Sequence, residues 1–183
     1  MKEVDTMYTI AITGHRPHKL PCGYNFLPEQ SLWSSDLTNF LVDYIMKAYR
    51  EHGTLRILSG MALGVDQLWC LAAVQAKKLG ADLKLVACIP CIGYDQKWPY
   101  YSQKTYANIL SKCDEQVHVT SAWYTPACLQ LRNEYMVDHA DELIAVWDSS
   151  PSGTANCVNY AKRKNVPVTI VPPVPPSKFL RAE

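Results

Sequence analysis

The stretch SGMALGVDQ, Ser59–Gln67, follows the short apolar run Leu55–Leu58 and precedes a segment with helical spacing that ends near Gly80. A strand that gives way directly to a helix is the repeating unit of α/β proteins. Glycine gives an anion access to the backbone, and the N–H groups at the start of a helix attract negative charge. The stretch therefore predicts an α/β fold with a candidate anion site where this strand meets this helix.

The same alternation of strand and helix recurs along the chain. Apolar runs predict strands at residues 8–13, 55–58, 83–89, 116–119, 143–147 and 168–171. Helical periodicity predicts helices at residues 28–51, 61–79, 102–112, 126–139 and 154–164. Strands that are joined through helices favour a doubly wound, mostly parallel α/β sheet flanked by helices. In such folds ligands bind beyond the carboxyl ends of the strands.

Composition limits the classes of protein that fit. The 183 residues are 48% hydrophobic and 19% charged, as in an ordinary globular chain. Eighteen basic and seventeen acidic residues leave a net charge of +1, which gives little support to nonspecific nucleic-acid binding. We expect one domain over residues 1–171 and a proline-rich tail over 172–183, with neither a signal peptide nor a membrane span.

The seven cysteines are odd in number and most lie inside apolar runs. This usage is typical of reduced thiols in a cytoplasmic protein. Cys88 and Cys91 have the spacing of a metal-binding pair, but no second pair of cysteines or histidines stands near them. We therefore expect buried structural thiols and no metal site.

Three polar loops follow predicted strands and carry the candidate chemistry. The first contains Gly14, His15 and Arg16, and the charges of His15 and Arg16 suit a phosphate or carboxylate. The loop after the fifth strand, residues 148–156, offers hydroxyls and an accessible backbone from Ser150, Ser152, Gly153 and Thr154. Each loop also has a structural interpretation, as solvated side chains or as a turn with a helix cap.

The middle loop, SGMALGVDQ, leaves two interpretations open. Gly60 and Gly64 lie about one helical turn apart, which would clear one face of the first turn for phosphate or ribose. Asp66 would repel phosphate, so it suits a sugar hydroxyl, backbone N–H groups or a cation such as Arg16. Alternatively, the glycines permit tight packing and Asp66 complements the helix dipole. Arg132 heads an apolar helix face, where it lies at the edge of the core or points at a ligand.

Four motifs together resemble the SLOG superfamily over residues 8–171, and its YpsA-like branch most closely. They are TGHRP, SGMALGVDQ, RNEYMVDHAD and the segment at residues 143–161, which reads LIAVWDS and then SPSGTANCVNYA. SGMALGVDQ is also similar to a segment of DNA-processing protein A. The resemblance implies a Rossmann-like domain that senses or sequesters a nucleotide or nucleotide-derived ligand, without a cofactor. It implies ligand binding by Gly14, His15, Arg16, Ser59, Gly60, Gly64, Asp66, Arg132, Asn133, Ser150, Ser152, Gly153 and Thr154.

An enzymatic alternative comes from the Lonely Guy phosphoribohydrolases of the same superfamily. Those enzymes cleave a nucleotide N-glycosidic bond with an Arg, which Arg132 matches, and with a Glu at the position where this chain has Cys157. A thiol cannot replace that carboxylate beside an oxocarbenium-like centre. The remaining catalytic candidates are Asp66, Glu134 and Arg132, and no catalytic role is assigned. DNA binding is a weaker alternative because the charge is near neutral, and a homo-oligomer stays open.

Overall fold

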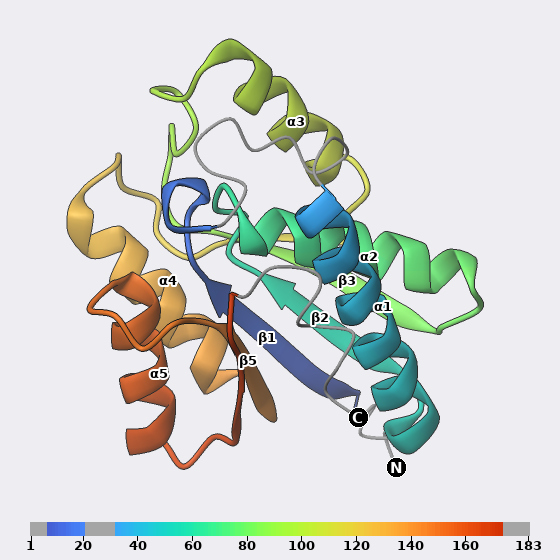
Figure 1. The fold of residues 1–183 in the computed structure, drawn as a ribbon. Coiled ribbons are helices and arrows are strands. Elements are labelled where there is room, and N and C mark those ends of the chain that lie inside the picture. Colours follow the sequence, from blue (N-terminus) through green and yellow to red (C-terminus); the bar gives the residue numbers. More distant parts are fainter. Residues whose placement is uncertain (1–6, 21–31, 174–183) are drawn as a thin grey trace, which may run out of the picture.

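The computed structural model describes residues 7–20 and 32–173 of the chain (Figure 1). Its strands are β1 (Tyr8–Gly14), β2 (Leu55–Ser59), β3 (Leu83–Ile89), β4 (Glu115–His118), β5 (Glu142–Val146) and β6 (Val168–Val171). Its helices are α1 (Leu32–His52), α2 (Val65–Lys78), α3 (Tyr100–Leu110), α4 (Pro126–Asp138) and α5 (Gly153–Arg163), with a short 3-10 helix at Pro17–Lys19.

All six strands pair in parallel in the order β4-β3-β2-β1-β5-β6. Strands β2, β3 and β4 follow one another from β1 towards one edge of the sheet. The chain then crosses back, and β5 and β6 lie between β1 and the other edge. The order of strands therefore reverses between β1 and β5. Loops that leave the carboxyl ends of these two strands diverge, and this divergence opens the crevice in which doubly wound folds bind ligands.

Helices cover both faces of the sheet. Helices α1 and α2 pack together on one face, and α4 and α5 pack on the other, as Figure 1 shows. The larger core lies under α1 and α2 and contains the fully buried side chains of Trp69, Ile57 and Leu41. A smaller core under α4 and α5 contains Met136 and Cys157. Strands covered on both sides explain why β3 is apolar along nearly its whole length.

The predicted doubly wound α/β class is confirmed, and the sheet is parallel throughout. The predicted start of α2 is wrong: the helix begins at Val65 rather than at Met61. Gly64 has a φ of 99°, a left-handed conformation that ends the extended loop and that glycine adopts without strain. The expected start of α1 at Pro28 lies outside the described residues, as does the proline-rich tail from residue 174 onward.

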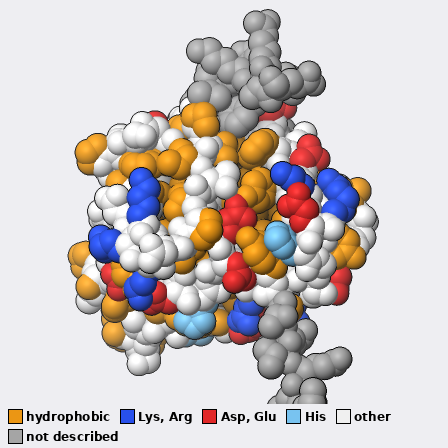
Figure 2. Space-filling model, turned by 90° about the horizontal axis from the view of Figure 1, so that it is seen from below, with side chains coloured by type: hydrophobic (Ala, Val, Ile, Leu, Met, Phe, Trp, Pro, Cys, Tyr) orange, Lys and Arg blue, Asp and Glu red, His pale blue; other side chains and the backbone are white. Residues whose placement is uncertain are grey.

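The surface shows no segregation of charge on the face drawn in Figure 2, where acidic, basic and hydrophobic side chains are interspersed. Among residues 7–20 and 32–173, no helix has the length and apolar character that crossing a bilayer requires. The mixture of charges in Figure 2 agrees with the net charge of +1.

Two carboxylates each tie the amino end of one strand to the strand beside it, β5 to β1 through Asp141 and β4 to β3 through Asp114. Asp141 Oδ2 accepts a hydrogen bond of 2.8 Å from the backbone N–H of Thr9, and Asp114 Oδ2 accepts one of 2.7 Å from that of Leu85. Asp114 also forms an ion pair with Lys77 of α2. Partial burial acts to raise the pKa of Asp114, but the hydrogen bonds from Lys77 and Leu85 hold it below its ordinary value.

We predict that Asp114→Asn lowers the free energy of unfolding by about 1 kcal/mol at neutral pH, because it removes a charge-assisted hydrogen bond from a half-exposed site. A depressed folded-state pKa stabilises the protein above the unfolded pKa of roughly 4, and that contribution disappears as the pH falls through the folded pKa. Urea unfolding of both proteins from about pH 7 to about pH 2 measures this difference.

The exposed Asp43, on the outer face of α1, provides the control. Asp43→Asn should leave stability within roughly 0.5 kcal/mol of wild type. A difference between Asp114→Asn and wild type that stays constant over the whole pH range would contradict the role given to this carboxylate.

Candidate functional site

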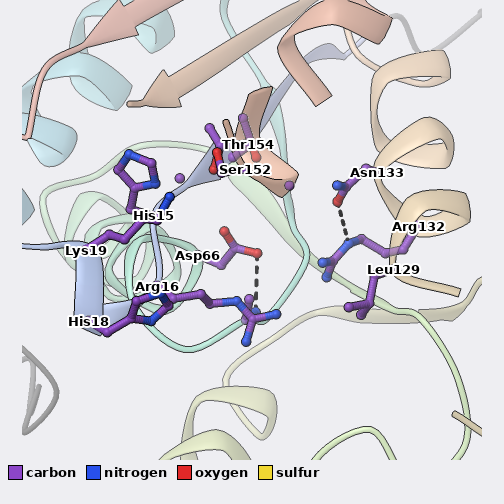
Figure 3. A pocket seen from close by; sticks show the side chains of 14 residues that line it. His15, Arg16, His18, Lys19, Asp66, Leu129, Arg132, Asn133, Ser152 and Thr154 are labelled. Atoms are coloured by element: carbon purple, nitrogen blue, oxygen red, sulfur yellow. Dashed lines mark hydrogen bonds between the residues drawn. The ribbon is translucent and has the colours of Figure 1, made fainter. Parts of the chain in front are cut away.

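A cavity of about 310 Å³ opens where the strand order reverses, between the carboxyl ends of β1 and β5. This volume lies at the lower end of the range of roughly 300–1,000 Å³ that is typical of small-molecule pockets. The loops after β1, β2 and β5 all contribute to its wall, and the first two turns of α4 and the first turn of α5 complete it (Figure 3). All three loops singled out in the sequence thus meet around one cavity.

The charges around the cavity are mostly basic. Arg16 and Lys19 come from the loop after β1, and Arg132 comes from α4 (Figure 3). His15 and His18 also line the cavity, whereas Asp66 is the acidic residue of the lining. A cavity walled by cations attracts small anions such as phosphate.

The start of α5 presents open backbone to the cavity. Ser152 caps the helix and its hydroxyl accepts a hydrogen bond of 3.2 Å from the N–H of Ala155. Within the described part of the chain, the N–H groups of Gly153 and Thr154 have no acceptor. A Cβ atom built on Gly153 would meet nothing within 4 Å. This terminus therefore has both the free donors and the space that an oxyanion requires.

Gly60 serves packing, which is one of the two interpretations that the sequence left open. Its missing side chain leaves space for the guanidinium of Arg132, which would overlap a Cβ at this position. Arg132 is only 4% exposed and donates from Nη1 to the carbonyl of Gly60 and from Nε to Asn133 Oδ1 at 2.9 Å. Gly60 is needed for the packing of Arg132 against the loop, and it does not line the cavity.

Gly64 also serves packing. A Cβ on Gly64 would lie 2.6 Å from the carbonyl oxygen of His15, so the missing side chain lets the loop before α2 approach the loop after β1. Of the two interpretations left open for Gly60 and Gly64, these contacts favour tight packing over a helix face cleared for a phosphate. Both glycines precede the helix, and each is closed off by a neighbouring chain segment.

Asp66 is the buried carboxylate of the cavity wall. It is 5% exposed, and its Oδ2 accepts a hydrogen bond of 3.2 Å from the N–H of Ala62 (Figure 3). Among the described residues, Oδ1 has no hydrogen-bond partner. Burial raises the pKa of Asp66, although the charges of Arg132 and Arg16 oppose this shift. Asp66 can therefore accept a hydrogen bond from a donor placed in the cavity.

An imidazole–carboxylate pair joins the first and third loops. The buried His15 donates from Nε2 to Asp148 Oδ1 over 2.7 Å, and the same oxygen accepts from the N–H of Ser150 at 2.9 Å. These hydrogen bonds, from Ser150 first and then His15, hold the pKa of Asp148 well below its usual range. Lys19 adds a link from Nζ to the carbonyl of Pro151 at 3.2 Å. The two loops are thus fixed to each other across the mouth of the crevice.

Most of the residues expected to bind a ligand line this cavity: Gly14, His15, Arg16, Asp66, Arg132, Asn133, Ser152, Gly153 and Thr154. The others lie outside the lining: Ser59, Gly60, Gly64 and Ser150. The Ser59 hydroxyl bonds to the carbonyl of Asp66 at 2.9 Å, which is a structural contact. Glu134, a catalytic candidate, accepts from Gln130 at 2.9 Å and also lies outside the lining.

Five further residues line the cavity that the sequence motifs did not predict: Thr13, His18, Lys19, Ala62 and Leu129. Lys19 and His18 could have been found, because Pro17 favours a tight turn that keeps nearby basic residues close to Arg16.

Cys157, which stands at the position of the Lonely Guy glutamate, is fully buried in the smaller core, and burial raises the pKa of its thiol to about 12. No three His, Cys, Asp or Glu side chains of residues 7–20 and 32–173 gather in a way that could hold a metal ion.

Two solved structures of DNA processing protein A share this fold. The protein from Streptococcus pneumoniae matches with a TM-score of 0.59 and 18% identity, over 91% of this chain and 50% of the other. The protein from Helicobacter pylori, which was solved to describe its single-stranded DNA binding mode, matches with a TM-score of 0.58 and 17% identity, over 91% of this chain and 66% of the other. The chain therefore spans half to two thirds of these larger proteins.

Sequence relatives are matched over most of their own length. An uncharacterised SPbeta prophage-derived protein, YoqJ of Bacillus subtilis strain 168, is 33% identical over 138 residues, which are 69% of this chain and 81% of YoqJ. A UPF0398 protein of Bacillus cereus is 28% identical over 161 residues, which are 86% of this chain and 84% of that protein. The family YpsA, described as the YspA SLOG family, matches residues 10–172, and the chain belongs to this family.

Proposed function

We propose that the cavity binds a nucleotide or a nucleotide-derived ligand and that the protein senses or sequesters it. The observation that carries this proposal is the pairing, in one cavity, of an open helix N-terminus with a buried carboxylate that has a free oxygen. One end of the cavity is suited to an anion, and the other end is suited to a neutral hydrogen-bond donor. A phosphorylated ribose has both properties.

The phosphate would bind at the start of α5. Gly153 and Thr154 offer free N–H groups there, and the Thr154 side chain, 5% exposed, lines the cavity. Lys19 reaches the same loop, since its Nζ lies 3.3 Å from Ser150 Oγ. Arg16 lies on the opposite side of the opening (Figure 3). Backbone donors, a helix dipole and a cation such as Lys19 together are the usual partners of a phosphate.

The sugar would bind at Asp66. A carboxylate repels phosphate but accepts hydrogen bonds from hydroxyls, and hydrogen bonds to a charged acceptor are stronger than those between neutral groups. A ribose hydroxyl would make such a bond at the free oxygen of Asp66, which lies in the cavity wall. Arg132 compensates the charge of Asp66, and its contact with Gly60 holds the guanidinium in place. This assignment predicts that ribonucleotides bind better than deoxyribonucleotides.

DNA binding is the alternative suggested by the structural relatives. One of them is described by its single-stranded DNA binding mode. Binding of a nucleic-acid backbone needs many contacts between basic side chains and phosphates, and the net charge of +1 of this chain gives this little support. A cavity of about 310 Å³ favours a small ligand instead.

We predict that Gly153→Val reduces nucleotide affinity at least about tenfold, which is roughly 1.4 kcal/mol, because the new side chain fills the phosphate position. The fold should be retained, since a Cβ there meets no neighbour. Calorimetric titration with AMP, GMP, CMP and UMP measures affinity, and thermal shift confirms binding by mass action.

Asn156→Val is the matched control, since it places the same side chain on an exposed position of α5 outside the cavity. This variant should bind like the wild type. Equal affinity of Gly153→Val and Asn156→Val would show that the start of α5 is only a structural turn.

A second prediction concerns the sugar. Wild type should prefer a ribonucleotide to its 2′-deoxy form by roughly tenfold, as expected for a hydrogen bond to a charged acceptor. Asp66→Asn keeps the shape of the side chain but removes its charge, so the preference should fall towards equality. If Asp66→Asn prefers the ribonucleotide as strongly as the wild type does, Asp66 does not bind the sugar. That outcome would not affect the phosphate site proposed at the start of α5.

One observation favours an N-glycosidase as second candidate: the buried Asp66, with its raised pKa, lies in the cavity near Arg132. Perturbed carboxylates of this kind occur at catalytic sites. Against it, the position of the Lonely Guy glutamate carries Cys157 in the core. We expect the wild type to release no free base from the monophosphates, as followed by chromatography. If the wild type releases base, and Asp66→Asn releases it at a rate lower by orders of magnitude, the protein is an enzyme.

A further inference from the structure

One face of α4 forms a side of the cavity that the phosphate and the sugar do not use. Leu129, Arg132 and Asn133 lie at positions i, i+3 and i+4 of this helix, so they share one face, and all three line the cavity. Figure 3 shows them on the other side of Asp66 from His15. With the phosphate at the start of α5 and the sugar at Asp66, this face is left for the third part of a nucleotide, its base.

The side-chain amide of Asn133 has a fixed orientation. Arg132 Nε lies 2.9 Å from the amide oxygen, Oδ1. A guanidinium has N–H donors and no acceptor, so the group that it meets must be the oxygen and not the NH2 group. Arg132 is itself held by its hydrogen bond to the carbonyl of Gly60 and is almost fully buried. The amide therefore cannot turn over without breaking a charge-assisted hydrogen bond.

This orientation makes Asn133 a donor towards the cavity. Because Oδ1 faces Arg132, the NH2 group lies on the other side of the amide, and among the described residues it has no hydrogen-bond partner. Leu129 is apolar, and the guanidinium of Arg132 only donates. The side chains on this face of α4 thus offer hydrogen-bond donors, and their one acceptor, Oδ1, is already engaged.

Nucleobases differ in the group that they would present to such a face. Adenine and cytosine carry an exocyclic amino group, which donates, whereas hypoxanthine and uracil carry a carbonyl oxygen at the same ring position, which accepts. An asparagine that recognises adenine accepts from the amino group with its oxygen and donates to a ring nitrogen. Here the oxygen is engaged with Arg132, so an amino group would meet the NH2 group of Asn133, a donor against a donor. A carbonyl oxygen would instead accept from that NH2 group.

We propose that Asn133 recognises the base and selects nucleotides whose base presents a carbonyl oxygen, an oxopurine or an oxopyrimidine. The inference rests on the proposed function, since it requires a nucleotide in the cavity. Leu129 would contact the apolar face of the base. A neutral carbonyl fits this side better than a second phosphate does, because the nearby charges of Arg132 and Asp66 already compensate each other.

The test compares two matched pairs of nucleotides by calorimetric titration of the full-length protein. IMP differs from AMP, and UMP from CMP, by a carbonyl oxygen in place of one amino group. We expect IMP and UMP to bind about tenfold more tightly than their partners, since a mismatched base leaves the donor of Asn133 without an acceptor. Equal affinities within both pairs would overturn the inference and leave the phosphate and sugar sites in place. Failure of all four to bind would refute the proposed function itself, and the inference with it.

Ribose 5-phosphate separates recognition of the base from recognition of the rest of the nucleotide. It carries the phosphate and the sugar but no base, so it should bind more weakly than IMP. If it binds as tightly as IMP, the base makes no useful contact with α4, and the inference is wrong although the phosphate and sugar sites stand.

The variant Asn133→Asp tests the residue directly. It keeps the shape of the side chain and the bond to Arg132, but it replaces the NH2 group by an oxygen that accepts. The added charge weakens the binding of every nucleotide, so the ratio of the IMP and AMP affinities is the quantity to compare. This ratio should fall from about ten towards one or below. Asn159→Asp, which adds the same charge at an exposed position of α5 outside the cavity, should keep the wild-type ratio. A wild-type ratio in Asn133→Asp would show that Asn133 does not recognise the base.

Discussion

The cavity depends on one buried contact, in which the guanidinium of Arg132 occupies the space beside Gly60 and donates to its carbonyl oxygen. A buried charge without partners destabilises a protein by several kcal/mol. Here the Gly60 carbonyl, the Asn133 side chain and the nearby Asp66 carboxylate share the compensation. The contact joins α4, from one face of the sheet, to the loop that leads into α2 on the other face. It thereby sets the positions of Arg132 and Asp66 in the cavity wall.

The topology supplies the crevice, and local contacts turn it into a defined site. A reversal of strand order opens space between β1 and β5 in any sheet of this kind. In this chain the bonds from His15 to Asp148 and from Lys19 to Pro151 hold the two diverging loops together. The helix start at Gly153 is left without such a bond. The first and third loops are therefore tied to each other, while the backbone donors at the start of α5 stay free.

The strands and helices were predictable because hydrophobic periodicity records which faces are buried. The positions of the three loops followed from the same reasoning, since parallel strands bring their carboxyl ends to one edge. The sequence did not decide between the two roles that it left open for Gly60 and Gly64, ligand access and tight packing. Gly60 is paired with a side chain 72 residues away, and His15 with one 133 residues away. Spacing along the chain shows that a glycine is required, but only the fold shows whether it makes room for a ligand or for an arginine.

The distribution of charge around the cavity has a practical consequence for anyone who handles this protein. Arg16, Lys19 and Arg132 face a space in which Asp66 provides the negative charge. Cations gathered in this way bind small oxyanions with modest selectivity, and their attraction weakens as ionic strength rises. Phosphate, sulfate or citrate in a purification buffer would therefore compete for the phosphate position that we propose at the start of α5. Preparations in such buffers would look more stable and less responsive to nucleotides than preparations in a zwitterionic buffer of low ionic strength.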